Sequence, residues 1–411
     1  MDNTNCRICK KKIQTIFCDL GYSPLANSYL KKKDLKKEEI YLPLKVFFCK
    51  DCFLFQLPNY KNPTTIFKNY DYLSSYSKDW LEHCEKYVNK IFKSLKLTSK
   101  SKVCEIASND GYLLYFFLKK NINALGIEPS KVAAKIARGK NIKTICKFFT
   151  TRLANKLKNN KFDLIICNNV LAHVPNILDF VNGLKIILSK NGTITFEFPH
   201  FLNLINKLQF DTIYHEHYSY LTIHTLIKLF KKFKLSIYKI EKINTHGGSL
   251  RVYVKHNENK IIKISSDAIK IINEENESKI FNKEKFLWFN KNLQIIKENT
   301  INKLIKIKVN NKRIVCYGAP AKGNTFINFC LISKNLLPVT FDKSIVKIGK
   351  YLPGSHIPII SPDQIKKYKP DFVVILAWNL KDEIVKEFKK KKIQTKFITC
   401  IPRFKITNNL L

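Results

Sequence analysis

One short stretch concentrates side chains that transfer protons or bind metals. Between residues 214 and 220 the chain reads Tyr-His-Glu-His-Tyr-Ser-Tyr, with two imidazoles, one carboxylate and three phenols. In a strand, His215 and His217 would share one face, an arrangement that suits a metal ion. In a helix or turn, Tyr214 would lie beside His217 instead, which suits acid–base chemistry. The spacing alone leaves both geometries open.

Two Cys-x-x-Cys pairs near the start of the chain predict a structural zinc site. They are Cys6 with Cys9, and Cys49 with Cys52. Each pair places two thiolates on one tight turn, and four thiolates make a closed tetrahedral site that suits zinc. A redox dithiol fits less well, because two pairs match one metal site. A closed site leaves no position for a substrate, so we expect this zinc to have no catalytic role.

The overall composition narrows the class of protein. No run of about 18 uncharged apolar residues occurs, so no membrane span is predicted. The first residues lack the basic-then-apolar layout of a signal peptide, which makes the cytoplasm the expected location. The net charge is +41, yet only six residues are Arg, the side chain preferred for phosphate recognition. We therefore expect a solvated Lys-rich surface and no nucleic-acid partner.

The region from about 102 to 256 alternates strands and helices in the pattern of a doubly wound parallel sheet. Strands are expected at 103–106, 124–128, 162–167 and 193–198, with a helix at 177–188. In such a sheet, ligands bind at the carboxyl ends of the strands.

The acids at those strand ends indicate which ligand to expect. The loop after the first strand has only one glycine, Gly111, so it offers no close cradle for a pyrophosphate. Glu105 lies in the first strand and Glu128 ends the second, where an acid accepts ribose hydroxyls and repels phosphate. An adenosine without phosphates fits, and S-adenosylmethionine (SAM) is such a ligand. A terminal hairpin from 235–242 and 250–255 adds the layout of class I methyltransferases.

The last hundred residues repeat the α/β pattern after a connecting helical region at 257–310. The loop Gly318-Ala-Pro-Ala-Lys-Gly-Asn324 follows a strand and opens a helix. A glycine-containing loop with a lysine at a helix N-terminus is a good anion site, so Lys322 could meet a diphosphate. Alternatively, the glycines only shape the turn. Earlier in the chain, the Tyr and Ser residues at 70–77 could line a polar pocket or belong to an ordinary core or loop.

Taken in order, these motifs resemble those of the sugar-nucleotide C-methyltransferases, which methylate a carbon of a nucleotide-linked keto-deoxysugar. The resemblance spans nearly the whole chain. It rests on the two Cys pairs, Glu105–Gly111, Gly126–Ser130, Asn169–Pro175, Tyr214–Tyr220, His246–Arg251, Gly318–Asn324 and Lys347–Gly354. One departure is Ala107, where such loops usually carry glycine.

The resemblance implies an α/β fold of three parts. These are a zinc-binding domain at 1–70, a class I SAM-dependent methyltransferase domain at 71–256, and a helical connector with a C-terminal Rossmann-like domain at 257–411. It also implies a mechanism in which a base removes the proton next to a ketone and the carbanion takes the methyl group. A base with a pKa near neutral is needed, and His217 is the candidate, so the geometry that pairs it with Tyr214 becomes the favoured one.

The expected site residues fall into four groups. The catalytic group is His217, Tyr214, Glu216, His173 and Tyr76. The SAM-binding group is Glu105, Ala107, Asn109, Gly111, Glu128, Asn168 and Asn169. The group expected to bind the small-molecule acceptor is Tyr72, His246, Arg251, Lys322 and Asn324. The zinc ligands are Cys6, Cys9, Cys49 and Cys52.

Three alternatives remain open at this stage. The product could carry an O-methyl group, because neither pocket shape nor stereochemistry follows from the sequence. A zinc-ribbon RNA methyltransferase would fit the charge but not the scarcity of arginine or the second α/β domain. A non-enzymatic scaffold would fit a degenerate fold, although the intact acids and the Tyr/His stretch argue against it. We expect a monomer.

Overall fold

The computed structural model describes residues 4–60, 73, 75 and 78–408. They form two compact units. Unit 1 consists of Met1–Ile13, Cys49–His200 and Tyr218–Ser278, and unit 2 consists of Gln14–Phe48, Phe201–His217 and Lys279–Leu411. Because each unit combines segments from distant parts of the chain, the linear three-domain division stays a prediction.

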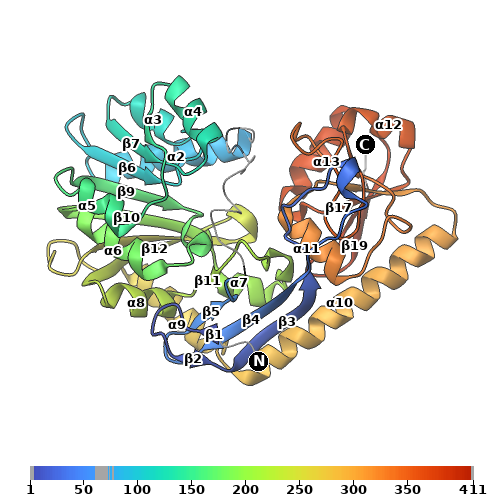
Figure 1. The fold of residues 1–411 in the computed structure, drawn as a ribbon, viewed down its shortest axis with the longest axis horizontal. Helices are drawn as coiled ribbons and strands as arrows, with labels where there is room; N and C mark the ends of the chain where they lie inside the picture. Colours follow the sequence, from blue (N-terminus) through green and yellow to red (C-terminus); the bar gives the residue numbers. More distant parts are fainter. Residues whose placement is uncertain (1–3, 61–72, 74, 76–77, 409–411) are drawn as a thin grey trace. The chain divides into compact units, whose positions relative to one another are not determined.

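Unit 1 is built around a seven-stranded sheet with the order β12-β13-β10-β9-β6-β7-β8 (Figure 1). The strands are β6 Lys102–Ile106, β7 Asn123–Ile127, β8 Lys143–Ile145, β9 Phe162–Asn168, β10 Leu188–Pro199, β12 Leu235–Ile243 and β13 Ser249–His256. Strands β6 to β10 run parallel, whereas β13 is antiparallel to both β10 and β12. This order, with one antiparallel strand inserted near the edge, confirms the predicted class I methyltransferase fold.

Short polar caps start the helices of unit 1. These helices are α2 Lys78–Ser94, α3 Leu114–Leu118, α4 Lys131–Gly139, α5 Thr151–Lys156, α6 Ile177–Ile187, α8 Ile223–Lys231 and α9 Ser266–Glu277, with single turns at η3 Leu171–His173 and η5 Thr245–Gly247. The side chains of Ser130, Thr150 and Asn176 each accept the backbone N–H three residues ahead. On one side of the sheet, α2 and α3 share a buried core with Val103 and Leu164.

Two short strand pairs complete unit 1. Strand β1 (Thr4–Asn5) pairs with β2 (Lys12–Ile13), and β5 (Leu54–Gln56) pairs with β11 (Ser219–Tyr220). Between the first two cysteines, Arg7 donates through its guanidinium to the carbonyl of Tyr218, over 3.0 Å. The start of the chain is thereby tied to the residue that follows His217.

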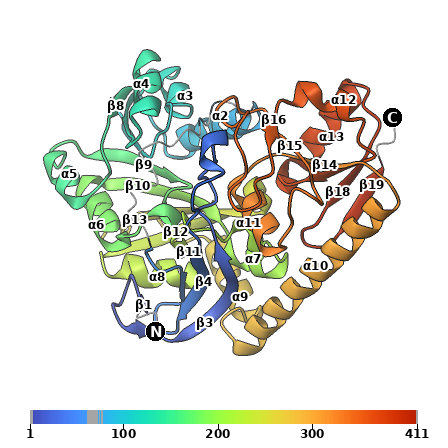
Figure 2. The ribbon, with the colours of Figure 1, turned by 45° about the vertical axis from the view of Figure 1, so that its right-hand side comes forward.

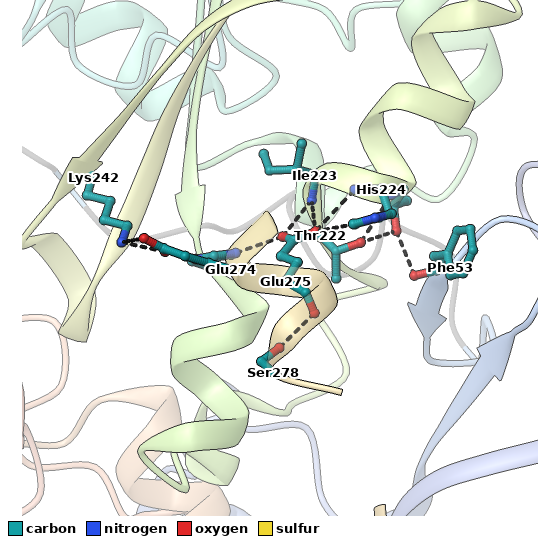
Figure 3. Close-up of polar contacts among 10 residues, drawn as sticks. Phe53, Thr222, Ile223, His224, Lys242, Glu274, Glu275 and Ser278 are labelled. Carbon is teal, nitrogen blue, oxygen red and sulfur yellow. Dashed lines mark hydrogen bonds and ion pairs between the residues drawn. The ribbon is translucent and has the colours of Figure 1, made fainter. Parts of the chain in front are cut away.

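A buried carboxylate fixes the start of α8 in unit 1 (Figure 3). Glu275 accepts from the backbone N–H groups of Ile223 and His224 and from the ring of His224, and also lies 2.8 Å from the ring of His200. Its burial would raise its pKa, but the two histidines and the amide of Ile223 lower it. An acid at a helix N-terminus is also favoured by the helix dipole, so Glu275 stabilises the region just after residues 214–220.

Unit 2 contains a second α/β sheet with the order β16-β15-β14-β17-β18-β19. Its strands are β14 Ile314–Tyr317, β15 Thr340–Phe341, β16 Ile359–Ile360, β17 Phe372–Ile375, β18 Lys396–Thr399 and β19 Lys405–Asn408, and only β19 pairs antiparallel. The helices are α7 Phe201–Asn206, α10 Lys283–Val309, α11 Ala321–Phe329, α12 Ile365–Tyr368 and α13 Lys381–Lys390, with single turns at η1 Lys32–Asp34, η4 Phe210–Thr212, η6 Pro362–Gln364 and η7 Trp378–Leu380. This mostly parallel sheet with covering helices is the Rossmann-like arrangement expected for the end of the chain.

The long helix α10 of unit 2, whose ribbon Figure 2 shows, is held by aromatic side chains. It packs on Phe17 of β3 (Thr15–Ser23), which pairs with β4 (Leu42–Cys49). The ring of Phe17 lies 5.2 Å from Phe286 and 4.9 Å from Phe289, and Asn290 donates to the carbonyl of Phe17. Such ring pairs add to the stabilisation from burial alone. Among the described residues, no helix is both long and apolar enough to cross a bilayer.

Candidate functional site

The four paired cysteines come together in unit 1 as predicted. Their sulfur atoms all lie within 4.8 Å of one another, and those of Cys9 and Cys49 are 3.7 Å apart. Sulfurs at about 2.3 Å from a central ion would be about 3.8 Å apart at the corners of a tetrahedron. The donor set and its spacing therefore fit one zinc ion. All other cysteines are free thiols, and most are buried.

The loop after β6 turns sharply through three left-handed residues. Ala107, Asn109 and Gly111 have φ of 59°, 49° and 76°. A β-carbon on Gly111 would come within 2.3 Å of Ile142, so glycine is required there for close packing as well as for its conformation. The positive φ of Ala107 explains why related loops prefer glycine, since a non-glycine residue in this conformation costs about 1–2 kcal/mol.

The two predicted acids lie buried at the carboxyl ends of β6 and β7. Glu128 accepts the backbone N–H of Asn109 and of Ser130, so it braces the loop that follows β6. Burial raises the pKa of Glu128, and those two amides lower it in part. Burial also raises the pKa of Glu105 well above its ordinary value, and the charges of Glu128 and Asp110 add to the rise.

Two of the residues expected to bind SAM, Asn168 and Asn169, lie at the end of the neighbouring strand β9. The side chain of Asn168 is buried, and neither of its polar atoms has a hydrogen-bond partner among the described residues. Asn169 has a positive φ of 52°, and its backbone N–H donates to the backbone carbonyl of Glu197. A buried amide group with unused donors and acceptors at a strand end is suited to a ligand. His173 ends the short helix η3 just beyond.

The stretch at 214–217 is a turn in unit 2, so the strand geometry with two histidines on one face is not formed. The hydroxyl of Tyr214 lies 2.9 Å from Nε2 of His217, and Nδ1 of His217 lies 2.7 Å from the carbonyl oxygen of Thr212. A carbonyl only accepts, so Nδ1 carries the proton and Nε2 holds the lone pair, which accepts from the phenol. A ring nitrogen oriented in this way can act as a base.

The other two polar residues of this stretch have different partners. Glu216 accepts from the side-chain amide of Asn27, and burial raises its pKa. Nε2 of His215 donates to the carbonyl of Pro43. These two contacts hold the turn in place, and no hydrogen bond is described between Glu216 and His217.

A further polar cluster in unit 2 adjoins the same turn. The indole N–H of Trp378 donates to buried Asp211 over 2.6 Å, and Lys322 donates to Asn379 over 2.8 Å. Burial raises the pKa of Asp211 to about 6, although the charge of Lys322 opposes that rise. Asp211 directly precedes Thr212, the residue whose carbonyl holds His217.

Three family models match this chain in order. A zinc binding domain matches residues 6–67, a methyltransferase domain matches residues 76–240, and a C-methyltransferase C-terminal domain matches residues 244–402. The C-methyltransferase NovU of Streptomyces niveus is 29% identical over 394 residues, which are 93% of this chain and 92% of that protein. Together these matches span residues 6–402 and show that the chain is a methyltransferase similar to the C-methyltransferases. It is a SAM-dependent enzyme with a zinc-binding domain.

Two solved structures of methyltransferases are similar to part of the chain. The magnesium protoporphyrin IX methyltransferase ChlM from Synechocystis with bound SAM is 13% identical, covers 48% of this chain and 99% of its own, and has a TM-score of 0.36. A SAM dependent methyltransferase from Archaeoglobus fulgidus is 16% identical, covers 49% of this chain and 87% of its own, and also has a TM-score of 0.36.

The other residues expected to bind the acceptor, and the expected catalytic residue Tyr76, lie in several places. Tyr72 and Tyr76 lie outside the described residues. In unit 1, Arg251 is buried and paired with Glu197, and His246 packs against Trp80. In unit 2, the buried side chain of Asn324 donates a hydrogen bond to the carbonyl of Ala26. Their roles in binding stay predictions.

The structure of the methyltransferase also reveals polar residues that the sequence interpretation missed. Glu197 lies inside an apolar strand, Asp211 lies between apolar residues, and His83 lies on the amphipathic helix α2. The signal for the two acids was present, because a carboxylate within an apolar run is rarely buried without a partner. Nothing in its spacing separated His83 from an ordinary helix surface residue.

Proposed function

We propose that the enzyme is a SAM-dependent C-methyltransferase that removes the proton next to the ketone of a nucleotide-linked keto-deoxysugar and methylates that carbon. The product would serve surface-glycan or other deoxysugar biosynthesis. The observation that carries the proposal is the Tyr214–His217–Thr212 arrangement, which supplies an oriented base. Carbon methylation next to a ketone needs such a base, because the carbon is a nucleophile only after losing its proton.

His217 is the residue that we assign to proton removal. With Nδ1 held by the carbonyl of Thr212, the proton from the substrate carbon would go to Nε2. Tyr214 now donates to Nε2 and could instead turn its hydroxyl to the ketone oxygen, where negative charge develops in the transition state. The buried Glu216, bonded to Asn27, keeps the backbone of this turn in place.

The loop and acids of unit 1 are the residues that we assign to SAM. When bound, SAM supplies an electrophilic methyl group and a positively charged sulfur. Glu128 would accept the ribose hydroxyls while its backbone partners keep it oriented, and Glu105 and Asn168 would line the same strand ends. A ring of buried carboxylates suits a cationic ligand better than a phosphate-bearing one.

For the acceptor, we assign Lys322 to the diphosphate. Lys322 lies at the start of α11, where backbone N–H groups and the helix dipole favour an anion. Burial lowers the pKa of Lys322, and the negative charge of Asp211 opposes that change. An anionic diphosphate bound beside Lys322 would favour its charged form in the same way. The free thiols among the described residues are consistent with our expectation of a cytoplasmic enzyme.

One assay tests the proposal. Purified enzyme is incubated with SAM and a panel of nucleoside-diphosphate-linked keto-deoxysugars, and NMR locates the new methyl group. We expect a carbon-bound methyl next to the ketone, and deuterium from solvent at the same carbon when SAM is omitted. An oxygen-bound methyl group, or no turnover of any keto-sugar, would contradict the proposal.

A further inference from the structure

A second histidine of the enzyme is held in a defined orientation, within unit 1. His83 lies on α2 with a side chain 21% exposed, next to Glu197, which is fully buried. Nε2 of His83 lies 3.1 and 3.0 Å from the two carboxylate oxygens. The guanidinium of Arg251 lies 3.1 Å from the same nitrogen, but two carboxylate oxygens, which only accept, lie at least as close, so Nε2 carries the proton and Nδ1 faces away from Glu197.

Glu197 is itself fixed by two other residues. Arg251 donates to it over 2.7 Å and Thr245 donates over 3.0 Å. Burial would raise the pKa of Glu197, but His83 and Arg251 together lower it, so the group is ionised. Arg251 balances that charge, and its guanidinium also lies over the ring of Tyr87 at 4.3 Å. The arrangement therefore needs no second proton on His83.

His83 is also part of a cavity wall. Within the described part of the chain, Nδ1 of His83 has no hydrogen bond. His83 lines a cavity of about 490 Å³, together with Lys86, Tyr87 and Arg251 from the same region and Lys270 of α9. That volume is in the range of small-molecule sites. An imidazole nitrogen with a lone pair at such a wall is an acceptor for a ligand hydroxyl.

Ring contacts connect this cavity wall to the SAM loop. Trp80 stacks on His83 at 5.0 Å and lies 6.2 Å from the ring of Tyr112. Tyr112 directly follows Gly111, and its hydroxyl hydrogen-bonds to Glu105 and lowers the pKa of that acid. Glu197 also lies at the carboxyl end of β10, the edge at which ligands of such sheets bind. His83 is therefore close to the methyl-donor side of unit 1.

We propose that His83 is an acceptor-binding residue, whose Nδ1 accepts a hydrogen bond from a hydroxyl group of the methyl acceptor. Glu197 and Arg251 are the positioning residues that keep Nδ1 available. This assigns Arg251, expected from the sequence to contact the acceptor, a supporting role behind His83. The proposal rests on the proposed function only in requiring a small acceptor that carries hydroxyl groups.

Two substitutions of His83 test the contributions of its two ring nitrogens separately. The amide of His83→Gln reaches the position of Nε2, so this variant keeps the donor to Glu197 and loses the acceptor at Nδ1. The amide of His83→Asn reaches the position of Nδ1, so this variant keeps an acceptor there and loses the contact with Glu197. The probes are SAM by calorimetry and, for steady-state kinetics, the nucleoside-diphosphate-linked keto-deoxysugar that wild-type enzyme methylates.

We expect His83→Gln to raise the KM for the acceptor roughly tenfold, the value of one lost hydrogen bond, with unchanged SAM affinity and thermal midpoint. His83→Asn should keep an acceptor KM closer to that of wild type. The inference is overturned if the Gln variant behaves as wild type, or if both variants lose SAM affinity and thermal stability together. If wild-type enzyme methylates a different hydroxylated compound and no keto-sugar, the proposed function fails, and the same pair of variants on that compound still decides the role of His83.

Discussion

Both units contain a histidine with one ring nitrogen held by an oxygen, but the oxygens differ in charge. In unit 1, His83 donates to the carboxylate of Glu197, which also binds Arg251. In unit 2, His217 donates to the uncharged carbonyl of Thr212, and its second nitrogen accepts from Tyr214. A carboxylate partner on its own favours a protonated imidazole, but Arg251 already balances the charge of Glu197, whereas the carbonyl of Thr212 fixes the tautomer of His217 and leaves its Nε2 with a lone pair. The first arrangement suits binding and the second suits proton transfer.

The largest expected effect comes from removing the unit 2 histidine. His217→Ala should lower kcat by about 10²–10⁴-fold, the usual contribution of a general base. SAM affinity should not change, because the residues that we assign to SAM belong to unit 1. Kinetics, calorimetry and solvent deuterium exchange without SAM measure these properties.

A matched control lies two residues away. His215→Ala removes an imidazole from the same turn, but one whose Nε2 donates to the carbonyl of Pro43 and so offers no lone pair there. This variant should lose far less activity. Equal losses in both variants would mean that the turn, and not the base, is what matters.

A second substitution, in unit 1, tests whether the charge of Glu128 contributes to SAM binding. Glu128→Gln keeps the size of the side chain and removes the negative charge. We expect SAM to bind about 10–100-fold more weakly, as for a lost charged hydrogen bond. Deuterium exchange of the acceptor should continue, because His217 is intact. Because exchange is measured without SAM, its loss in this variant would show that Glu128 supports the acceptor site and would contradict its assignment to SAM alone.

A smaller effect is expected from the zinc-binding region. Arg7 donates to the carbonyl of Tyr218, and its guanidinium lies 5.4 Å from the ring centroid of Tyr218. Arg7→Lys keeps the charge but lacks the planar fork, so the residue that follows His217 is held less firmly. We expect kcat to fall several-fold with about one zinc per chain retained. Zinc loss in metal analysis would instead assign Arg7 to folding of the metal site.

The smallest effect concerns the dependence of stability on pH. Asp211 has a pKa of about 6 in the folded protein, above its ordinary value of 3.8. Between about pH 4 and 6, the unfolded chain loses this proton first, so the free energy of unfolding falls with rising pH, by up to about 3 kcal/mol. Asp211→Asn should lack that fall. Parallel pH dependences of the urea midpoints for wild type and variant would contradict the assignment.

Much of the fold was predictable because its signals are local. The strands at β6, β7, β9 and β10 and the helix α6 lie within a few residues of their predicted positions. The edge strand β8 and the short helix α7 were not predicted. A three-residue strand such as Lys143–Ile145 is too short to show a hydrophobic pattern.

Part of the candidate site could be predicted from the spacing of residues in the sequence. Four cysteines in two pairs determined the zinc site, because each pair forms its own turn and four thiolates prefer one tetrahedral ion. The pairing of Tyr214 with His217 was one of two geometries that the sequence left open. The turn between them decided it.

The sequence by itself determined the α/β alternation, the cysteine site and the presence of acids at the strand ends, since each depends on neighbouring residues. Only the tertiary structure decided what His83 and Asp211 face. His83 meets Glu197 114 residues away, and Asp211 meets Trp378 167 residues away. Such contacts arise when distant segments bury their polar groups against each other. A buried carboxylate must find a donor, and the fold selects which donor is near enough.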